Sequence, residues 1–82
     1  MKLISQLNNY WNKLRYKKYK AGTSIDFIHY IHSIPNRTKG IVENVCEHSR
    51  FPITVKLNEP LEIDGLRTSY VNIKLNQIIC KN

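Results

Sequence analysis

The side chains best suited to chemistry form a basic and aromatic run between residues 13 and 20. Cationic side chains neutralise nucleic-acid phosphates and release their counterions, and aromatic rings interleaved with them can stack on bases. The run contains both types, in the order Lys13, Leu14, Arg15, Tyr16, Lys17, Lys18, Tyr19 and Lys20. It predicts a surface that binds a polyanion. The alternative is that Tyr16 and Tyr19 pack against a core and the lysines are only solvated.

The positive charge of the chain is concentrated in the same region. The chain has 82 residues, 13 Lys and Arg, 6 Asp and Glu, and a formal net charge of +7. Residues 1–20 carry six cations and no acid, whereas residues 21–82 carry seven cations and six acids. A compact basic cluster suits nucleic acid, an anionic membrane or an acidic protein surface. Three further cations could extend it, namely Arg37 and Lys39 in a predicted turn and Arg50 in the following loop.

Histidine and cysteine are the other residues with chemical potential, and their spacing argues against a site. The candidates are His29, His32, His48, Cys46 and Cys80. On a strand, His29 and His32 would point to opposite faces. The Cys46-x-His48 pair supplies only two of the four ligands usual for zinc. A Cys–His nucleophile would come without a glycine-rich loop or paired carboxylates. We therefore expect no metal, no cofactor, no small-molecule substrate and no enzymatic activity.

The two cysteines and the apolar pattern also bear on location. Two distant cysteines do not make a disulfide framework, and the sequence shows neither a signal peptide nor a long apolar segment. A cytoplasmic protein with reduced thiols is expected. Membrane binding by residues 2–20 is disfavoured, because the polar face of their first half consists mostly of Ser, Gln and Asn.

The periodicity predicts one helix followed by strands. Leu3, Leu7, Trp11 and Leu14 follow helical spacing, which predicts an amphipathic helix over residues 2–15. From Thr23 the pattern becomes that of strands, predicted over 24–34, 40–47, 53–58, 70–75 and 78–80, with a turn over 35–39. Alternation fails between Val42 and Val45, which predicts a β-bulge at Glu43–Asn44.

Five short strands in a flat sheet would leave unpaired edges and an exposed face, so we expect a small closed barrel. Its predicted core is Phe27, Val42, Val45, Ile53, Val55, Val71, Ile73 and Ile78.

A resemblance to a known group of folds agrees with this expectation. The residues that carry it are Gly22, Gly40-x-Val42-x-x-Val45, Phe51-Pro52-Ile53-x-Val55-x-Leu57 and the segment Leu75–Ile79. This pattern resembles SH3-like barrels. The glycine and Val-x-x-Val are similar to KOW-type barrels, and the FPITVKL segment is similar to the electron-transport accessory barrels of the photosystem I subunit IV group. The resemblance covers residues 22–79 and implies a five-stranded SH3-like barrel, and the basic N-terminal helix belongs to neither pattern. Together with the helical spacing, the expected fold is mainly β, with an N-terminal amphipathic helix or arm (residues 1–20) before a five-stranded SH3-like barrel (residues 21–82).

These observations predict a non-enzymatic binding protein. The leading hypothesis is nucleic-acid binding through Lys13–Lys20, extended by Arg37, Lys39 and Arg50. The alternative is a protein-interaction module, such as an accessory subunit or a phage or mobile-element regulator or inhibitor of a host protein. Ile, Lys and Asn together number 29, which hints at an AT-rich genome such as that of a phage or a low-GC bacterium.

Overall fold

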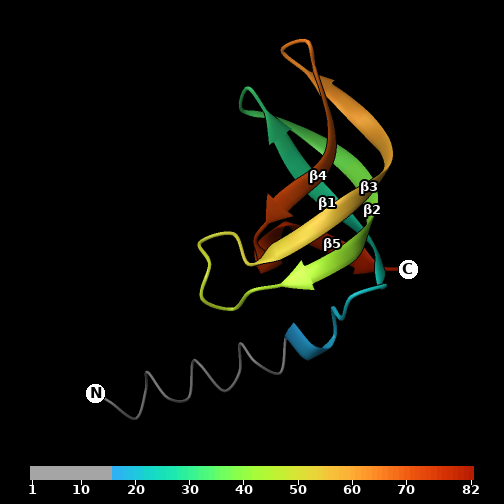
Figure 1. The fold of residues 1–82 in the computed structure, drawn as a ribbon, viewed down its shortest axis with the longest axis vertical. Coiled ribbons are helices and arrows are strands. Elements are labelled where there is room, and N and C mark those ends of the chain that lie inside the picture. The colour runs from blue at the N-terminus through green and yellow to red at the C-terminus, as the bar shows by residue number, and fades with distance from the viewer. Residues whose placement is uncertain (1–15) are drawn as a thin grey trace.

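Five antiparallel strands form one sheet in the order β4-β3-β2-β1-β5 (Figure 1). The structure, a computed structural model, describes residues 16–82. Its elements are β1 (Ser24–Ile31), β2 (Ile34–Val45), β3 (Ile53–Ile63), β4 (Leu66–Ile73), the 3-10 helix η1 (Leu75–Gln77) and β5 (Ile78–Lys81). Each of the first three strands pairs with the next along the chain, and η1 then leads from β4 to β5, which pairs with β1 at the other edge.

Two tight turns define two long hairpins. The first turn is His32–Ser33, with φ of 50° and 65°, and the second is Asp64–Gly65, with φ of 52° and 80°. Positive φ at both central residues matches the right-handed twist of the flanking strands. The predicted turn at 35–39 is wrong, because these residues continue β2, where Pro35 lies opposite Tyr30.

The inward-facing residues of the curved sheet form the core. It consists of Ile25, Phe27, Val42, Ile53, Val55, Leu57, Val71 and Ile73. Six of these eight were predicted from alternation. The predicted core residues Val45 and Ile78 are only partly buried and pack against this cluster. Ile25 and Leu57 were missed, although each continues the alternation of its strand.

The predicted bulge in β2 is confirmed. Val42 pairs with Val55 and Asn44 pairs with Thr54, so Glu43 is the extra residue. The bulge reverses the alternation at that point and turns both Val42 and Val45 toward the core.

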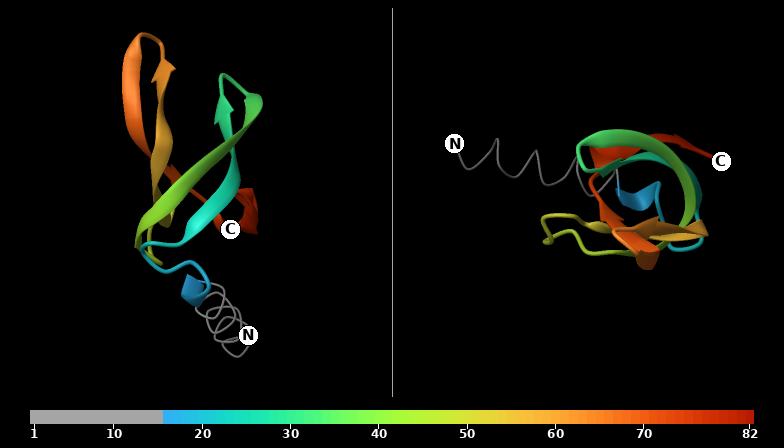
Figure 2. Two further views of the ribbon diagram at one scale, coloured as in Figure 1. Left: turned by 90° about the vertical axis from the view of Figure 1, so that its right-hand side faces the viewer. Right: turned by 90° about the horizontal axis from the view of Figure 1, so that it is seen from above.

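The predicted fold class is mainly β, as the structure shows, but the predicted closed barrel is wrong and the predicted helix has no support in the described residues. First, the sheet of residues 16–82 is open, with β4 and β5 at its edges, and it is not a closed barrel. The physical reason is that the pairing of β2 with β3 is confined to residues 40–45 of β2 and 53–57 of β3. The outer halves of these strands pair within their own hairpins, whose ribbons separate as a V (Figure 2), and the side chains of His32 and Asp64 bridge the two turns.

Second, the helix expected before the barrel is not part of the described fold. The prediction over 2–15 lies outside the described residues. Residues 16–19 form a single turn, in which the Tyr19 N–H donates to the Tyr16 carbonyl at 3.0 Å, and no α-helical element follows within residues 16–82. No helix of these residues is long and apolar enough to cross a membrane.

Candidate nucleic-acid interface

The described part of the basic segment presents its lysines to solvent and its tyrosines to the sheet. Lys17, Lys18 and Lys20 are exposed. Tyr16 and Tyr19 are partly buried and pack against the core cluster. Anchored rings of this kind cannot stack freely on bases, so their contribution is to hold the lysines in place.

Backbone hydrogen bonds fix the segment to β2. The Gly22 N–H donates to the Val42 carbonyl at 2.7 Å, and the Val42 N–H donates to the Thr23 carbonyl at 2.8 Å. Gly22 adopts φ of 93°, a conformation that favours glycine, and nothing lies where its Cβ would be. The residues before it therefore run beside the end of β2, where Lys17 and Lys20 border a shallow hollow with Asn44, Val45 and Glu47 among its lining.

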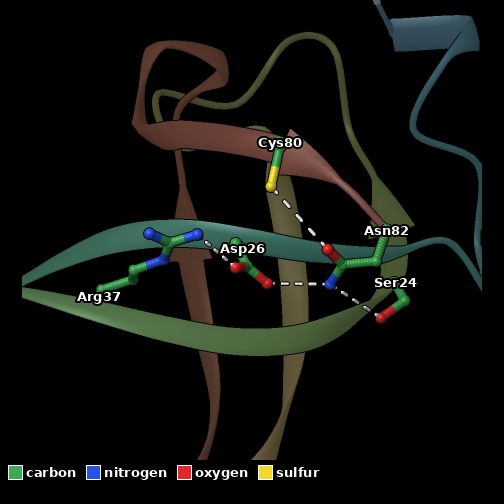
Figure 3. Close-up of polar contacts among 5 residues, drawn as sticks. All are labelled: Ser24, Asp26, Arg37, Cys80 and Asn82. Carbon is green, nitrogen blue, oxygen red and sulfur yellow. Dashed lines mark hydrogen bonds and ion pairs between the residues drawn. The ribbon is translucent and has the colours of Figure 1, made fainter.

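Arg37 belongs to a structural ion pair rather than to this surface. Its Nη2 donates to Asp26 Oδ2 at 2.9 Å, and the Asn82 Nδ2 donates to the other carboxylate oxygen at 2.9 Å (Figure 3). Asp26 is only 3% exposed. The hydrogen bonds from Asn82 and Arg37 hold the pKa of Asp26 below its ordinary value. The hydrogen bond to the Asp26 carboxylate in turn raises the pKa of Arg37. This cluster fastens the C-terminal strand β5 to β1 and β2.

The remaining predicted residues are dispersed. Lys39 lies with Arg37 in a cleft between the two hairpins, whose walls also contain Asn58 and Glu59. Arg50 is exposed in the loop before β3. Lys13 and Arg15 lie outside the described residues. The predicted cations therefore do not form one continuous surface within residues 16–82, and the cluster Lys17–Lys20 is separate from the cleft of Arg37 and Lys39.

Sequence reasoning missed a groove with two exposed aromatic rings. Tyr30 of β1 and Phe51 of the loop before β3 are 57% and 43% exposed. They line an open groove of about 460 Å³ with Asn72, Lys74 and the residues around η1. The Lys74 Nζ lies 5.2 Å from the Phe51 ring centre, within cation–π distance. No signal along the sequence joins these segments, because they meet only when the sheet curves.

Two polar residues shape the groove without adding charge. The Gln77 side chain donates to the Ile28 carbonyl at 2.9 Å and accepts from the Lys74 N–H at 2.8 Å, which fixes η1 against β1. His29 has a buried Nδ1 with no hydrogen-bond partner, and burial lowers its pKa below 6.5. His29 is therefore neutral at pH 7, and the positive charge of the groove comes from Lys74.

The groups considered for metal or thiol chemistry are dispersed as well. Within residues 16–82, no three His, Cys, Asp or Glu side chains gather where they could hold a metal ion. Cys46 and Cys80 are both free and exposed.

No protein-family model matches the chain, and neither does any curated protein or solved structure.

Proposed function

We propose that this protein is a non-enzymatic binding protein whose basic segment binds the phosphate backbone of nucleic acid. The observation that supports this most is the arrangement of residues 16–20. Lys17, Lys18 and Lys20 are exposed within four positions. Tyr16, which precedes them, and Tyr19, which lies between Lys18 and Lys20, pack against the core. The cations are therefore held on a defined surface, which reduces the conformational entropy lost when they bind phosphates.

The distribution of charge supports the same proposal. Residues 1–20 carry six of the thirteen Lys and Arg and no acid. The preceding cations Lys13 and Arg15 would extend the contact. The resemblance to SH3-like proteins is proposed only as the connectivity of a small five-stranded β fold, and it identifies no ligand. A cytoplasmic location stays a prediction.

The test neutralises the exposed lysines and compares a matched control. The variant Lys17→Gln, Lys18→Gln, Lys20→Gln removes three charges from the segment. A control variant removes three charges elsewhere, at the exposed residues Lys56, Arg67 and Lys81. Binding to short single strands and duplexes is measured by fluorescence anisotropy across a salt series. We expect the first variant to lower the slope of log affinity against log salt by about 2 to 3 and the control to change it little.

Two results would contradict the proposal. One is the absence of binding by the unmodified chain at low salt. The other is an equal loss in both variants, which would mean that net charge rather than the segment determines affinity.

A second candidate function rests on the ends of the hairpins. Ile34, directly after the first turn, is 63% exposed, and Leu66, directly after the second, is 72% exposed. Exposed aliphatic side chains at projecting hairpins are suited to a protein partner. If the unmodified chain retains a protein from nuclease-treated lysate that the variant Ile34→Ser, Leu66→Ser does not, this protein-interaction alternative is supported.

A further inference from the structure

The groove between Tyr30 and Phe51 is connected to the basic segment across η1. Lys18 and Tyr19 share a shallow hollow with Leu75 and Asn76. Asn76 also lines the groove. A ligand that follows the surface from the lysines therefore reaches the two exposed rings without crossing another element.

The chemistry of this path suits one kind of polyanion. The residues of 16–82 that line the hollow and the groove include the cations Lys18 and Lys74 and no carboxylate. The groove also carries Asn72, whose Oδ1 accepts from Thr54 Oγ1 at 2.7 Å, which leaves the amide hydrogens of its Nδ2 to donate. Along this path, cations can pair with phosphates and aromatic rings can stack on base faces. The amide of Asn72 can donate a hydrogen bond to a base edge.

We infer that the Tyr30–Phe51 groove holds unpaired bases, so that the protein binds single-stranded nucleic acid in preference to duplex. This inference rests on the proposed function and names the substrate class of that surface. Base faces are accessible to protein rings only when the strand is unpaired, whereas the phosphates that the lysines contact are accessible in both forms. The lysines supply affinity for single strands and duplexes alike, and the groove adds affinity for single strands.

The position of Lys74 supports an unpaired strand over an apolar peptide. Its ammonium lies 5.2 Å from the Phe51 ring centre, so a phosphate next to a stacked base would meet a cation at the same place. A peptide partner would need acidic side chains at these points to satisfy the same charges.

The experiment measures the affinity of the full chain for a mixed-sequence strand of about 12 nucleotides, as DNA and as RNA, and for the duplex of that strand. The test variants are Tyr30→Ala and Phe51→Ala. The matched control is Tyr70→Ala, which removes a ring that is 52% exposed on β4 and does not line the groove. Tyr30→Phe keeps the stacking face and should retain affinity. Thermal melts of each variant confirm folding, which these exposed positions should tolerate.

We expect Tyr30→Ala and Phe51→Ala each to weaken single-strand binding on the order of 5-fold or more and to leave duplex binding within twofold. Tyr70→Ala should leave both affinities within twofold. If binding is salt-dependent but the groove variants do not affect it, the inference is wrong and the proposed function stands. If the unmodified chain binds neither form, the proposed function and the inference both fail.

Discussion

Gly40 occupies a position in the sheet that has no room for a side chain. It lies in the middle of β2, paired with Ile25 on one side and Leu57 on the other. A Cβ built on it would overlap the Val55 Cγ1 and would lie 2.7 Å from the carbonyl oxygen of Lys56. The first obstacle belongs to a side chain and can rotate, but the second is backbone of the adjacent strand and cannot move without disturbing the ladder.

The substitution Gly40→Ala should therefore destabilise the fold strongly. Overpacking of this kind costs about 1–3 kcal/mol, and the fixed backbone obstacle places Gly40 toward the upper end of that range. The gain from a less flexible unfolded chain, about 0.4–1 kcal/mol, offsets part of it. A net loss of about 2 kcal/mol lowers Tm by roughly 8–16 °C in a domain of this size. Urea unfolding followed by circular dichroism measures the free energy of unfolding directly.

A second substitution tests the stated cause. Val55→Ala removes Cγ1 and thereby one of the two obstacles. The cost of Gly40→Ala should be smaller in the Val55→Ala background than in the unmodified chain, and still above zero because the Lys56 carbonyl remains. Gly65→Ala provides a contrasting control, since nothing lies near its Cβ and its cost comes from φ of 80° alone. A Gly40→Ala variant within about 0.5 kcal/mol of the unmodified chain would refute the packing argument.

Three other predictions concern titratable groups. The hydrogen bonds to Asp26, of which that from Asn82 has the largest effect, hold its pKa below the ordinary value of 3.8. As the pH falls below 3.8 the unfolded chain therefore takes up a proton before the folded chain does, and the free energy of unfolding should decrease. Asp26→Asn should reduce this dependence on pH, as measured by urea unfolding between about pH 2 and 6. Burial lowers the pKa of His29 below its ordinary value of 6.5, so the unfolded chain is again protonated first. The free energy of unfolding should therefore decrease as the pH falls below 6.5. His29→Gln should remove this decrease in the same urea titrations. The exposed pair between His32 Nε2 and Asp64 Oδ1, 2.9 Å apart, links the two hairpin turns, and a double-mutant cycle on thermal unfolding should give a coupling no larger than about 1 kcal/mol.

The parts of the fold that alternation determines were predictable, and those that depend on distant pairing were not. Strict alternation located most of the core, and its failure between Val42 and Val45 located the bulge at Glu43. The turn at His32–Ser33 contains no glycine, so the sequence placed it too late, at the proline and asparagine that follow. Pairing of β2 with β1 overrides the turn preference of those residues, as strand context often does.

Whether the sheet closes depends on pairing between strands that are far apart in the sequence, and no local pattern of residues predicts such pairing. Between Lys56 and Leu61 the ladder of β3 with β4 shifts register, and this stretch contains Pro60, which has no N–H to donate. Beyond this point β3 follows β4 away from β2. The sequence contains the proline and the acidic residues near it, but it does not indicate that the β1–β2 hairpin extends in a different direction from the β3–β4 hairpin.

The candidate site divides in the same way. The exposure of Lys17, Lys18 and Lys20 followed from their charge, whereas the anchoring of the neighbouring Tyr16 and Tyr19 depends on which side of the sheet the segment reaches. The Tyr30–Phe51 groove required β1, the loop before β3 and η1 to meet. The sequence does not indicate that either ring is exposed, since Phe is among the residues most often buried and Tyr is intermediate.

The anchoring of Tyr16 and Tyr19 also determines how the basic segment can be tested. Removing residues 1–20 would take away the lysines and, with them, two side chains that pack against the core cluster. Loss of binding after such a truncation would therefore follow from loss of charge or from disturbance of the sheet, and the two causes could not be separated. Substitutions limited to the exposed lysines keep the tyrosines and the hydrogen bonds of Gly22 and Thr23 to β2. For this chain, charge neutralisation at fixed structure is the sharper experiment, because the segment contributes to both the charged surface and the edge of the core.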